Sequence, residues 1–126
     1  MDKKRPVNLD LGTIALPITS YVSILHRVSG VIMFFAVAVL LWLLESSLAS
    51  EARFNELSDL FNNPLCQIIV WGTLAALAYH SVAGMRHMIM DFGVGEDSFY
   101  AGRLSAWAAL ALAALVIALI TLWVFL

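Results

Sequence analysis

The stretch Ala78-Tyr-His-Ser-Val-Ala-Gly-Met-Arg-His-Met-Ile-Met-Asp91 places ionisable side chains in a segment that is apolar enough to cross a bilayer. Ionisable groups inside a membrane segment are costly, so they usually face a protein interior and take part in function. In a helix, four residues of the stretch share one face, at spacings i, i+4, i+7 and i+11: His80, Gly84, His87 and Asp91. Because glycine has no side chain, this face has a groove beside His80 that a flat cofactor or a partner helix can approach.

The composition of the whole chain is that of an integral membrane protein. Of the 126 residues, 62% are hydrophobic and 13% are charged, and the mean hydropathy is +0.90. A soluble domain of this size needs far more polar surface. The net charge of −2 argues against nucleic acid as a partner. The single cysteine, Cys66, can form no internal disulfide and cannot by itself hold an iron–sulfur cluster.

Three apolar segments predict an all-α membrane fold with three transmembrane helices, at about residues 20–44, 64–90 and 104–126. A helix needs about 20 residues to cross the hydrocarbon core, so each segment is long enough. Residues 1–19 contain two prolines and a glycine and are expected to form a short N-terminal strap before the membrane domain, residues 20–126. Four tryptophans are expected to anchor span ends at the membrane interfaces: Trp42, Trp71, Trp107 and Trp123.

The basic residues outside the apolar cores predict the orientation of the chain. Residues 3–5 are all basic and precede the first span, and Arg86 and Arg103 flank the connection between the second and third spans. The connection between the first and second spans has one basic residue, Arg53, among several acidic ones. The excess of positive charge on cytoplasmic segments therefore places the strap and the second connection in the cytoplasm, with the first connection and the C-terminus outside.

His80 is a candidate axial ligand of haem iron. It lies about eleven residues from the predicted cytoplasmic end of its helix, at a depth of roughly 16 Å. Imidazole is a common axial ligand, although a neutral histidine can also simply bond to a neighbouring carbonyl or hydroxyl. His80 and His87 are separated by about 10.5 Å of helical rise, whereas trans nitrogens at metal–nitrogen lengths of about 2 Å lie only about 4 Å apart. His26 could come from the first span, but by residue count it is expected to lie shallower than His80, so a six-coordinate haem would need a histidine from a second subunit.

Ser23, His26 and Arg27 form a second polar group, at the mouth of the first span. Their spacing of i, i+3 and i+4 predicts one shared helix face. A hydroxyl, an imidazole and a guanidinium together suit a quinone head group or a haem propionate. The alternative is that Arg27 merely extends to the lipid headgroups. Ser29 and Gly30, one turn further in, are expected to allow close helix packing.

Asp91 ends the polar face of the second span. It is interpreted as the acidic partner of Arg86 or Arg103 in a surface salt bridge, or as a proton relay to a quinone. With the predicted orientation, this end of the second span and the His26-Arg27 pair lie on the same, cytoplasmic side of the membrane.

Three motifs together resemble the cytochrome b membrane-anchor subunit of bacterial succinate dehydrogenase (Complex II). They are Arg5-Pro-Val-Asn-Leu-Asp-Leu11, Ser23-Ile-Leu-His-Arg-Val-Ser-Gly30 and the stretch from Ala78 to Asp91. The likeness runs from about residue 5 to residue 103. The patterns H-R-x-[ST]-G and H-x-x-x-G-x-R-H-x-x-x-D are specific in combination.

The resemblance implies a complex in the bacterial cytoplasmic (inner) membrane, where the charge-based orientation puts the N-terminus of this chain in the cytoplasm and its C-terminus in the periplasm. A flavoprotein oxidises succinate, an iron–sulfur protein passes the electrons on, and two small anchors bind haem b and ubiquinone. The resemblance implies that His80 is the axial ligand and that the companion anchor supplies the opposite one. It also implies that Ser23 and Arg27 belong to the quinone site, and that His26, Arg27 and His87 lie near the haem propionates.

Two other interpretations stay open. An anchor of a related quinol:fumarate reductase would have similar partners and run the reaction in the opposite direction. A purely structural anchor would bind no haem. In either case the chain has no flavin or cluster motif, so succinate oxidation is expected to take place in partner subunits.

Overall fold

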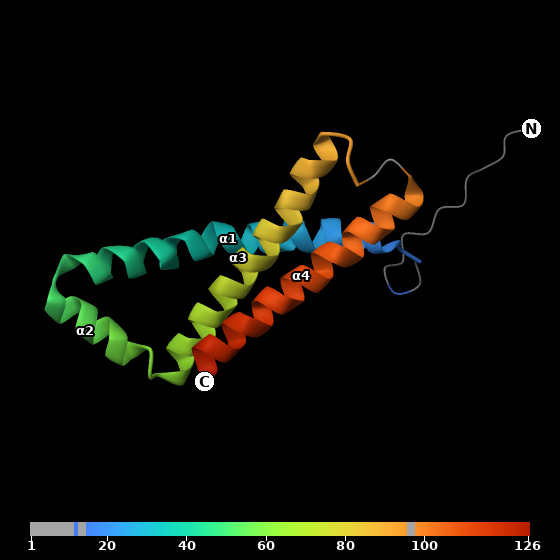
Figure 1. Ribbon diagram of the computed structural model, residues 1–126. Helices are drawn as coiled ribbons and strands as arrows, with labels where there is room; N and C mark the ends of the chain where they lie inside the picture. Colours follow the sequence, from blue (N-terminus) through green and yellow to red (C-terminus); the bar gives the residue numbers. More distant parts are fainter. Residues whose placement is uncertain (1–11, 13–14, 96–97) are drawn as a thin grey trace, which may run out of the picture.

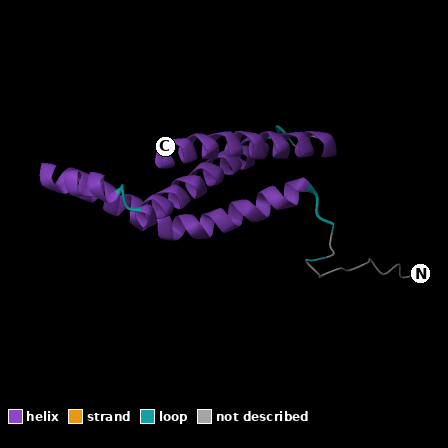
Figure 2. Ribbon diagram, turned by 90° about the horizontal axis from the view of Figure 1, so that it is seen from below, coloured by secondary structure: helices purple, strands orange, loops and turns teal. Residues whose placement is uncertain are grey.

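Three long apolar helices and one short polar helix account for most of the described chain (Figure 1). The computed structural model describes residue 12, residues 15–95 and residues 98–126. In chain order the helices are α1 (Ile18–Ala49), α2 (Glu51–Leu60), α3 (Pro64–Asp91) and α4 (Phe99–Phe125). Helices α1, α3 and α4 are each long and apolar enough to cross a membrane. Within the described residues only helices and loops are found (Figure 2), so the expected all-α fold with three spans is confirmed.

The helices extend beyond the predicted spans. α1 starts inside the predicted strap and continues to Ala49, and α4 starts at Phe99, so that Arg103 lies within the helix rather than before it. Most of the predicted strap, residues 1–11 and 13–14, lies outside the described residues. The first connection, for which no helix was predicted, contains α2, whose Leu57 is buried.

Polar caps and glycines define where the helices begin and end. Three side-chain oxygens accept a backbone N–H in the first turn of α2, α3 and α4: Ser50 from Arg53 at 3.1 Å, Asn63 from Leu65 at 2.9 Å, and Ser98 from Ala101 at 3.0 Å. Pro64 follows the cap of α3, at a position where its missing N–H leaves no bond unmade. After α3, Gly93 and Gly95 have φ angles of 81° and 87°, in the left-handed region that favours glycine.

The beginning of α1 packs against the second half of α3 and the beginning of α4. Val22, Ala83 and Ala106 form the centre of this contact, and Val22 and Ala106 are fully buried. Small side chains let the helices approach closely. The Tyr79 hydroxyl donates to the carbonyl oxygen of Val22 at 2.8 Å and ties α3 to α1. Further along, α1 diverges from α3, and α2 returns the chain to the start of α3 (Figure 1).

The C-terminal end of α4 lies beside the beginning of α3 (Figure 1). Trp71 Nε1 donates to Thr121 Oγ1 at 2.8 Å, and the Trp71 ring lies 6.4 Å from that of Phe125. Trp71 therefore links two helices through its N–H, which its assignment as an interfacial anchor did not anticipate. Trp107 and Trp123 are exposed on α4, as an interfacial role requires.

Large apolar side chains cover the outside of the isolated chain. Phe34, Phe35 and Leu48 of α1 and Leu119 of α4 are among the exposed ones. A soluble monomer rarely exposes so much contiguous apolar surface. Lipid or other membrane subunits therefore have to cover these helices.

Candidate functional site: a histidine cluster beside a polar cleft

Three histidines meet where α1 crosses α3. The rings of His26 and His80 are stacked, with centroids 4.3 Å apart and an angle of 8° between their planes. The ring of His87 lies 5.0 Å from that of His26 at an angle of 55°. His26 was expected to lie shallower in the membrane than His80, and the stacking limits that difference to the 4.3 Å between the rings.

Two glycines make room for the stacked rings. A Cβ atom added to Gly30 of α1 would lie 3.3 Å from His80 Cε1, and one added to Gly84 of α3 would lie 3.3 Å from His26 Nε2. Each glycine thus accommodates the histidine of the opposite helix. The groove expected at Gly84 is therefore filled by a neighbouring helix rather than left open to a flat cofactor.

Replacing Gly84 with valine is expected to destabilise the protein, because its Cβ and methyl groups would push against the His26 ring. Overpacking of this kind costs about 1–3 kcal/mol. Gly72 is the matched control on the same helix, since a Cβ there meets nothing within 4 Å. The thermal unfolding midpoint of the purified complex should fall for Gly84→Val and stay nearly unchanged for Gly72→Val. Equal midpoints for the two variants would contradict the close packing of His26 on Gly84.

Ser29 connects the two stacked histidines. Its hydroxyl lies 2.7 Å from the carbonyl oxygen of His26 and 3.0 Å from Nδ1 of His80. Nδ1 of His80 is thus engaged within the protein, and Nε2 is the ring nitrogen left for another partner. The His26 ring covers a face of the His80 ring, whereas a metal ion binds an imidazole nitrogen in the ring plane. The donor chemistry of His80 therefore fits a haem iron ligand.

His26 and His80 would not hold one iron between them, because their rings lie face to face in a parallel stack. No group of three or more histidine, cysteine, aspartate or glutamate side chains in the described ranges is arranged to hold a metal ion.

Ser23 lines a polar cleft at the beginning of α1. The cleft has a volume of about 450 Å³ and is bounded by α1, the end of α3 and the beginning of α4. Its lining residues are Thr19, Ser23, Arg86, His87, Met90, Ser98, Phe99 and Gly102. Ser23 and His87, which come from different motifs, are thus brought to one cavity. Arg27 is not among the lining residues and is exposed on α1.

Arg86 has a structural role that the sequence did not reveal. It is only 7% exposed, and it donates from Nε to Ser105 Oγ at 3.1 Å and from Nη2 to the Gly102 carbonyl at 3.2 Å. These bonds hold the end of α3 against the beginning of α4. Asp91 is exposed at the last residue of α3, and its predicted pairing or proton-relay role stays a prediction.

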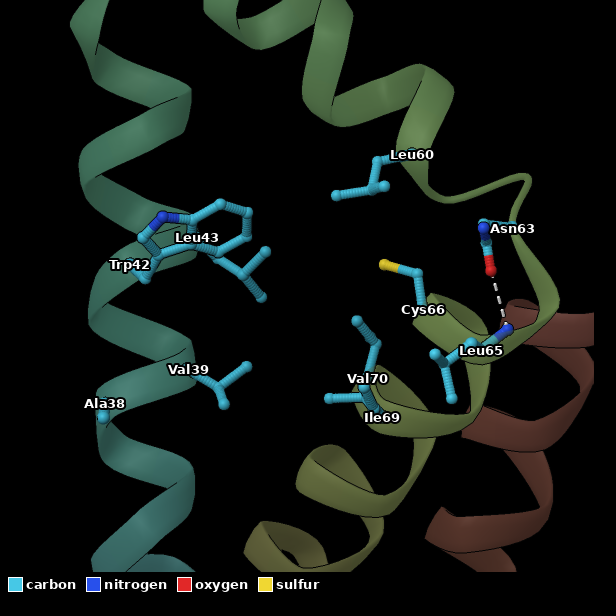
Figure 3. A pocket seen from close by; sticks show the side chains of 10 residues that line it. All are labelled: Ala38, Val39, Trp42, Leu43, Leu60, Asn63, Leu65, Cys66, Ile69 and Val70. Carbon is cyan, nitrogen blue, oxygen red and sulfur yellow. Dashed lines mark hydrogen bonds between the residues drawn. The ribbon is translucent and has the colours of Figure 1, made fainter.

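A larger cavity lies near the other ends of α1 and α3 and is almost entirely apolar. It has a volume of about 500 Å³ and is lined by residues of α1, the end of α2, the α2–α3 connection and α3 (Figure 3). Cys66 points into this space (Figure 3). The polar lining residue Asn63 uses its side-chain oxygen to accept the Leu65 N–H (Figure 3). With so few polar groups to orient a head group, it is a poorer quinone site than the polar cleft.

Comparison with known proteins matches nearly the whole chain to one family. Residues 1–121 match the family described as succinate dehydrogenase/fumarate reductase transmembrane subunit. A succinate dehydrogenase cytochrome b556 subunit of Coxiella burnetii is 37% identical over 125 residues, 98% of this chain and 99% of the relative. Proteins of the same name from Paracoccus denitrificans and Rickettsia felis are 31% and 36% identical, each over 96% of this chain and 92% of the relative.

Proposed function

The chain belongs to the succinate dehydrogenase/fumarate reductase transmembrane subunit family, and we propose that it is the haem b-binding anchor that helps to form the quinone site of a succinate:ubiquinone oxidoreductase. The observation that carries this proposal is the environment of His80. Its Nδ1 lies 3.0 Å from Ser29 Oγ, and its ring is stacked on His26 close to the polar cleft that Ser23 lines.

His80 would hold the haem iron through Nε2. The second axial ligand would come from a companion membrane anchor, since His26 is stacked on His80 rather than placed opposite it. His26, His87 and Arg27 would hydrogen-bond or pair with the propionates, because all three side chains carry N–H donors. A bound haem would supply a one-electron redox centre within the membrane.

Ser23 and Arg27 would bind the quinone head group. Reduction of ubiquinone takes up two electrons and two protons, and negative charge develops on the quinone oxygens before the protons arrive. A hydroxyl and a guanidinium that are already in place stabilise that charge. Arg27 stays protonated, so its role is electrostatic. Ser23 faces the cleft, and the exposed Arg27 is accessible to a quinone held between this chain and a partner subunit.

The proposed function implies which subunits assemble with this chain. A succinate dehydrogenase anchor assembles with a flavoprotein and an iron–sulfur subunit in the membrane. Succinate is oxidised in the flavoprotein, and electrons reach the quinone through the iron–sulfur subunit. A second small anchor would complete the membrane part of the complex and cover exposed apolar surface of this chain.

The family includes fumarate reductase anchors as well, so the physiological direction has to be measured. The names of the relatives favour succinate oxidation. The purified complex should reduce ubiquinone with succinate faster than it reduces fumarate with quinol. Faster fumarate reduction would assign the chain to the quinol:fumarate reductase branch and leave its role as an anchor unchanged.

The proposed orientation predicts that α2 faces the periplasm and that the α3–α4 turn faces the cytoplasm. In a Cys66→Ser background, single cysteines are introduced at two exposed positions, Asp59 in α2 and Val94 in the turn. A maleimide that cannot cross the inner membrane should label Asp59→Cys in cells with a permeabilised outer membrane. Val94→Cys should react only once the inner membrane is opened. The reverse pattern would separate Ser23 and Arg27 from an electron donor in the cytoplasm and contradict the proposed quinone site.

A further inference from the structure

We propose that Ser29 is the positioning residue of the haem ligand: its hydroxyl accepts the Nδ1–H of His80 and thereby leaves Nε2 as the nitrogen that coordinates iron. The proposal rests on the proposed haem-binding function and assigns to Ser29 a role beyond helix packing.

The direction of the two hydrogen bonds follows from the number of protons available. The hydroxyl of Ser29 has one proton, and the carbonyl oxygen of His26, 2.7 Å away, can only accept. The proton therefore lies between Ser29 Oγ and His26 O. Toward His80 Nδ1, 3.0 Å away, the same oxygen offers a lone pair. Nδ1 must then carry a proton, because two lone pairs facing each other at this distance would repel.

The consequence for His80 is a fixed tautomer and a fixed ring orientation. A neutral imidazole has one protonated nitrogen, so a proton on Nδ1 leaves the lone pair on Nε2. Ser29 is 5% exposed, so water does not readily replace its hydroxyl. The stack on His26 and the close approach to Gly30 hold the ring from other sides. A hydrogen bond accepted from the second nitrogen of a metal-binding histidine also raises the basicity of the ligand.

A purely local role for Ser29 is the alternative. Serine hydroxyls in helices often bond to a carbonyl one turn earlier, and Ser47 of the same helix does so to Leu44 O at 2.8 Å. Within the described residues, the Ser47 hydroxyl bonds to Leu44 of its own helix, whereas the Ser29 hydroxyl also reaches across to His80 of α3. Ser47 is therefore the matched control that separates the local bond from the bond to His80.

The test compares variants in the purified, assembled complex by haem content, rate of haem loss, redox titration and visible spectrum. Loss of a partner of this kind weakens metal binding by about ten- to a hundredfold. Ser29→Ala should therefore lose haem faster than the wild type. A less basic imidazole stabilises ferric iron less, so the haem potential should also rise. A tenfold loss of binding affinity that affects the ferric form alone corresponds to a rise of about 59 mV. Ser47→Ala should retain the wild-type values.

Two further variants keep the test decisive. Ser29→Thr retains a hydroxyl and should keep the wild-type haem potential. Ser29→Cys offers only a weak acceptor and should shift the haem potential upward, as Ser29→Ala does. The cysteine variant therefore serves as the test if the alanine variant does not assemble. An unchanged potential and an unchanged rate of haem loss in assembled Ser29→Ala or Ser29→Cys would overturn the proposal.

A parallel His80→Leu variant distinguishes failure of the Ser29 proposal from failure of the proposed haem site. If it changes the haem spectrum and the Ser29 variants do not, only the role of Ser29 is wrong. If it leaves the spectrum unchanged, His80 is not the ligand and the proposed haem site itself is wrong.

Discussion

Substitution of leucine for His80 is expected to remove the low-spin haem signal of this complex or to change it strongly. Leucine has a similar volume and no lone pair, so the ligand that His80 would give the iron would be lost. The experiment compares reduced-minus-oxidised spectra of wild-type and His80→Leu complexes at equal subunit content. A spectrum with altered bands would still be consistent with the assignment, because a ligand from a partner can substitute.

His87→Leu is the control for this substitution. His87 belongs to the same cluster through its 5.0 Å contact with His26, yet the proposed function assigns it to the haem propionates rather than to the iron. The variant should keep a low-spin spectrum. An unchanged spectrum in His80→Leu would exclude His80 as an obligatory ligand, and loss of low-spin haem in His87→Leu alone would assign the ligand to His87.

Arg27→Leu is expected to impair succinate-driven quinone reduction most severely among the quinone-site changes, and Ser23→Ala is expected to impair it less. A charge-assisted hydrogen bond contributes about 1.5–3 kcal/mol, which corresponds to roughly ten- to a hundredfold in rate or affinity. Removal of Arg27 also removes a fixed positive charge that the proposed function places beside a haem propionate. The measurement is the rate of ubiquinone reduction by the purified complex with succinate as donor.

Two controls make this measurement specific. Electron transfer from succinate to an artificial acceptor at the soluble subunits should survive both substitutions, because that route does not involve the membrane site. Arg53→Leu removes an exposed arginine from α2, where its contact in the described chain is an exposed pair with Glu56 at 3.5 Å, and should leave quinone reduction unchanged. Subunit content is verified first. Normal quinone reduction by an intact Arg27→Leu complex would mean that Arg27 only extends to the lipid headgroups.

The fold was largely predictable because membrane spans depend on a simple quantity, the length of apolar sequence. The helix α2 was missed because its residues are mostly polar and only Leu57 is buried. Its boundaries nevertheless carry recognisable signals, with Ser50 before Glu51 at one end and Asn63-Pro64 after the other. Composition therefore located the spans, and attention to capping residues would have found the short helix.

The site was predictable only within each helix. Helical spacing correctly placed His80 and Gly84 on one face of α3, but the pairing of Gly84 with His26 and of Gly30 with His80 depends on how α1 crosses α3. The same is true of Arg86, whose acceptors lie on α4. Contacts across helices are set by the crossing angle and the relative rotation of the helices, and periodicity along one helix contains neither quantity.

The central claim is that the chain is a haem-binding anchor rather than a purely structural one. The most direct test is a reduced-minus-oxidised visible spectrum of the purified wild-type complex, with haem quantified against the amount of this chain. The account predicts a low-spin haem b spectrum, with haem and chain present in equal amounts. An assembled complex that oxidises succinate and contains no haem would contradict it and identify the chain as a structural anchor.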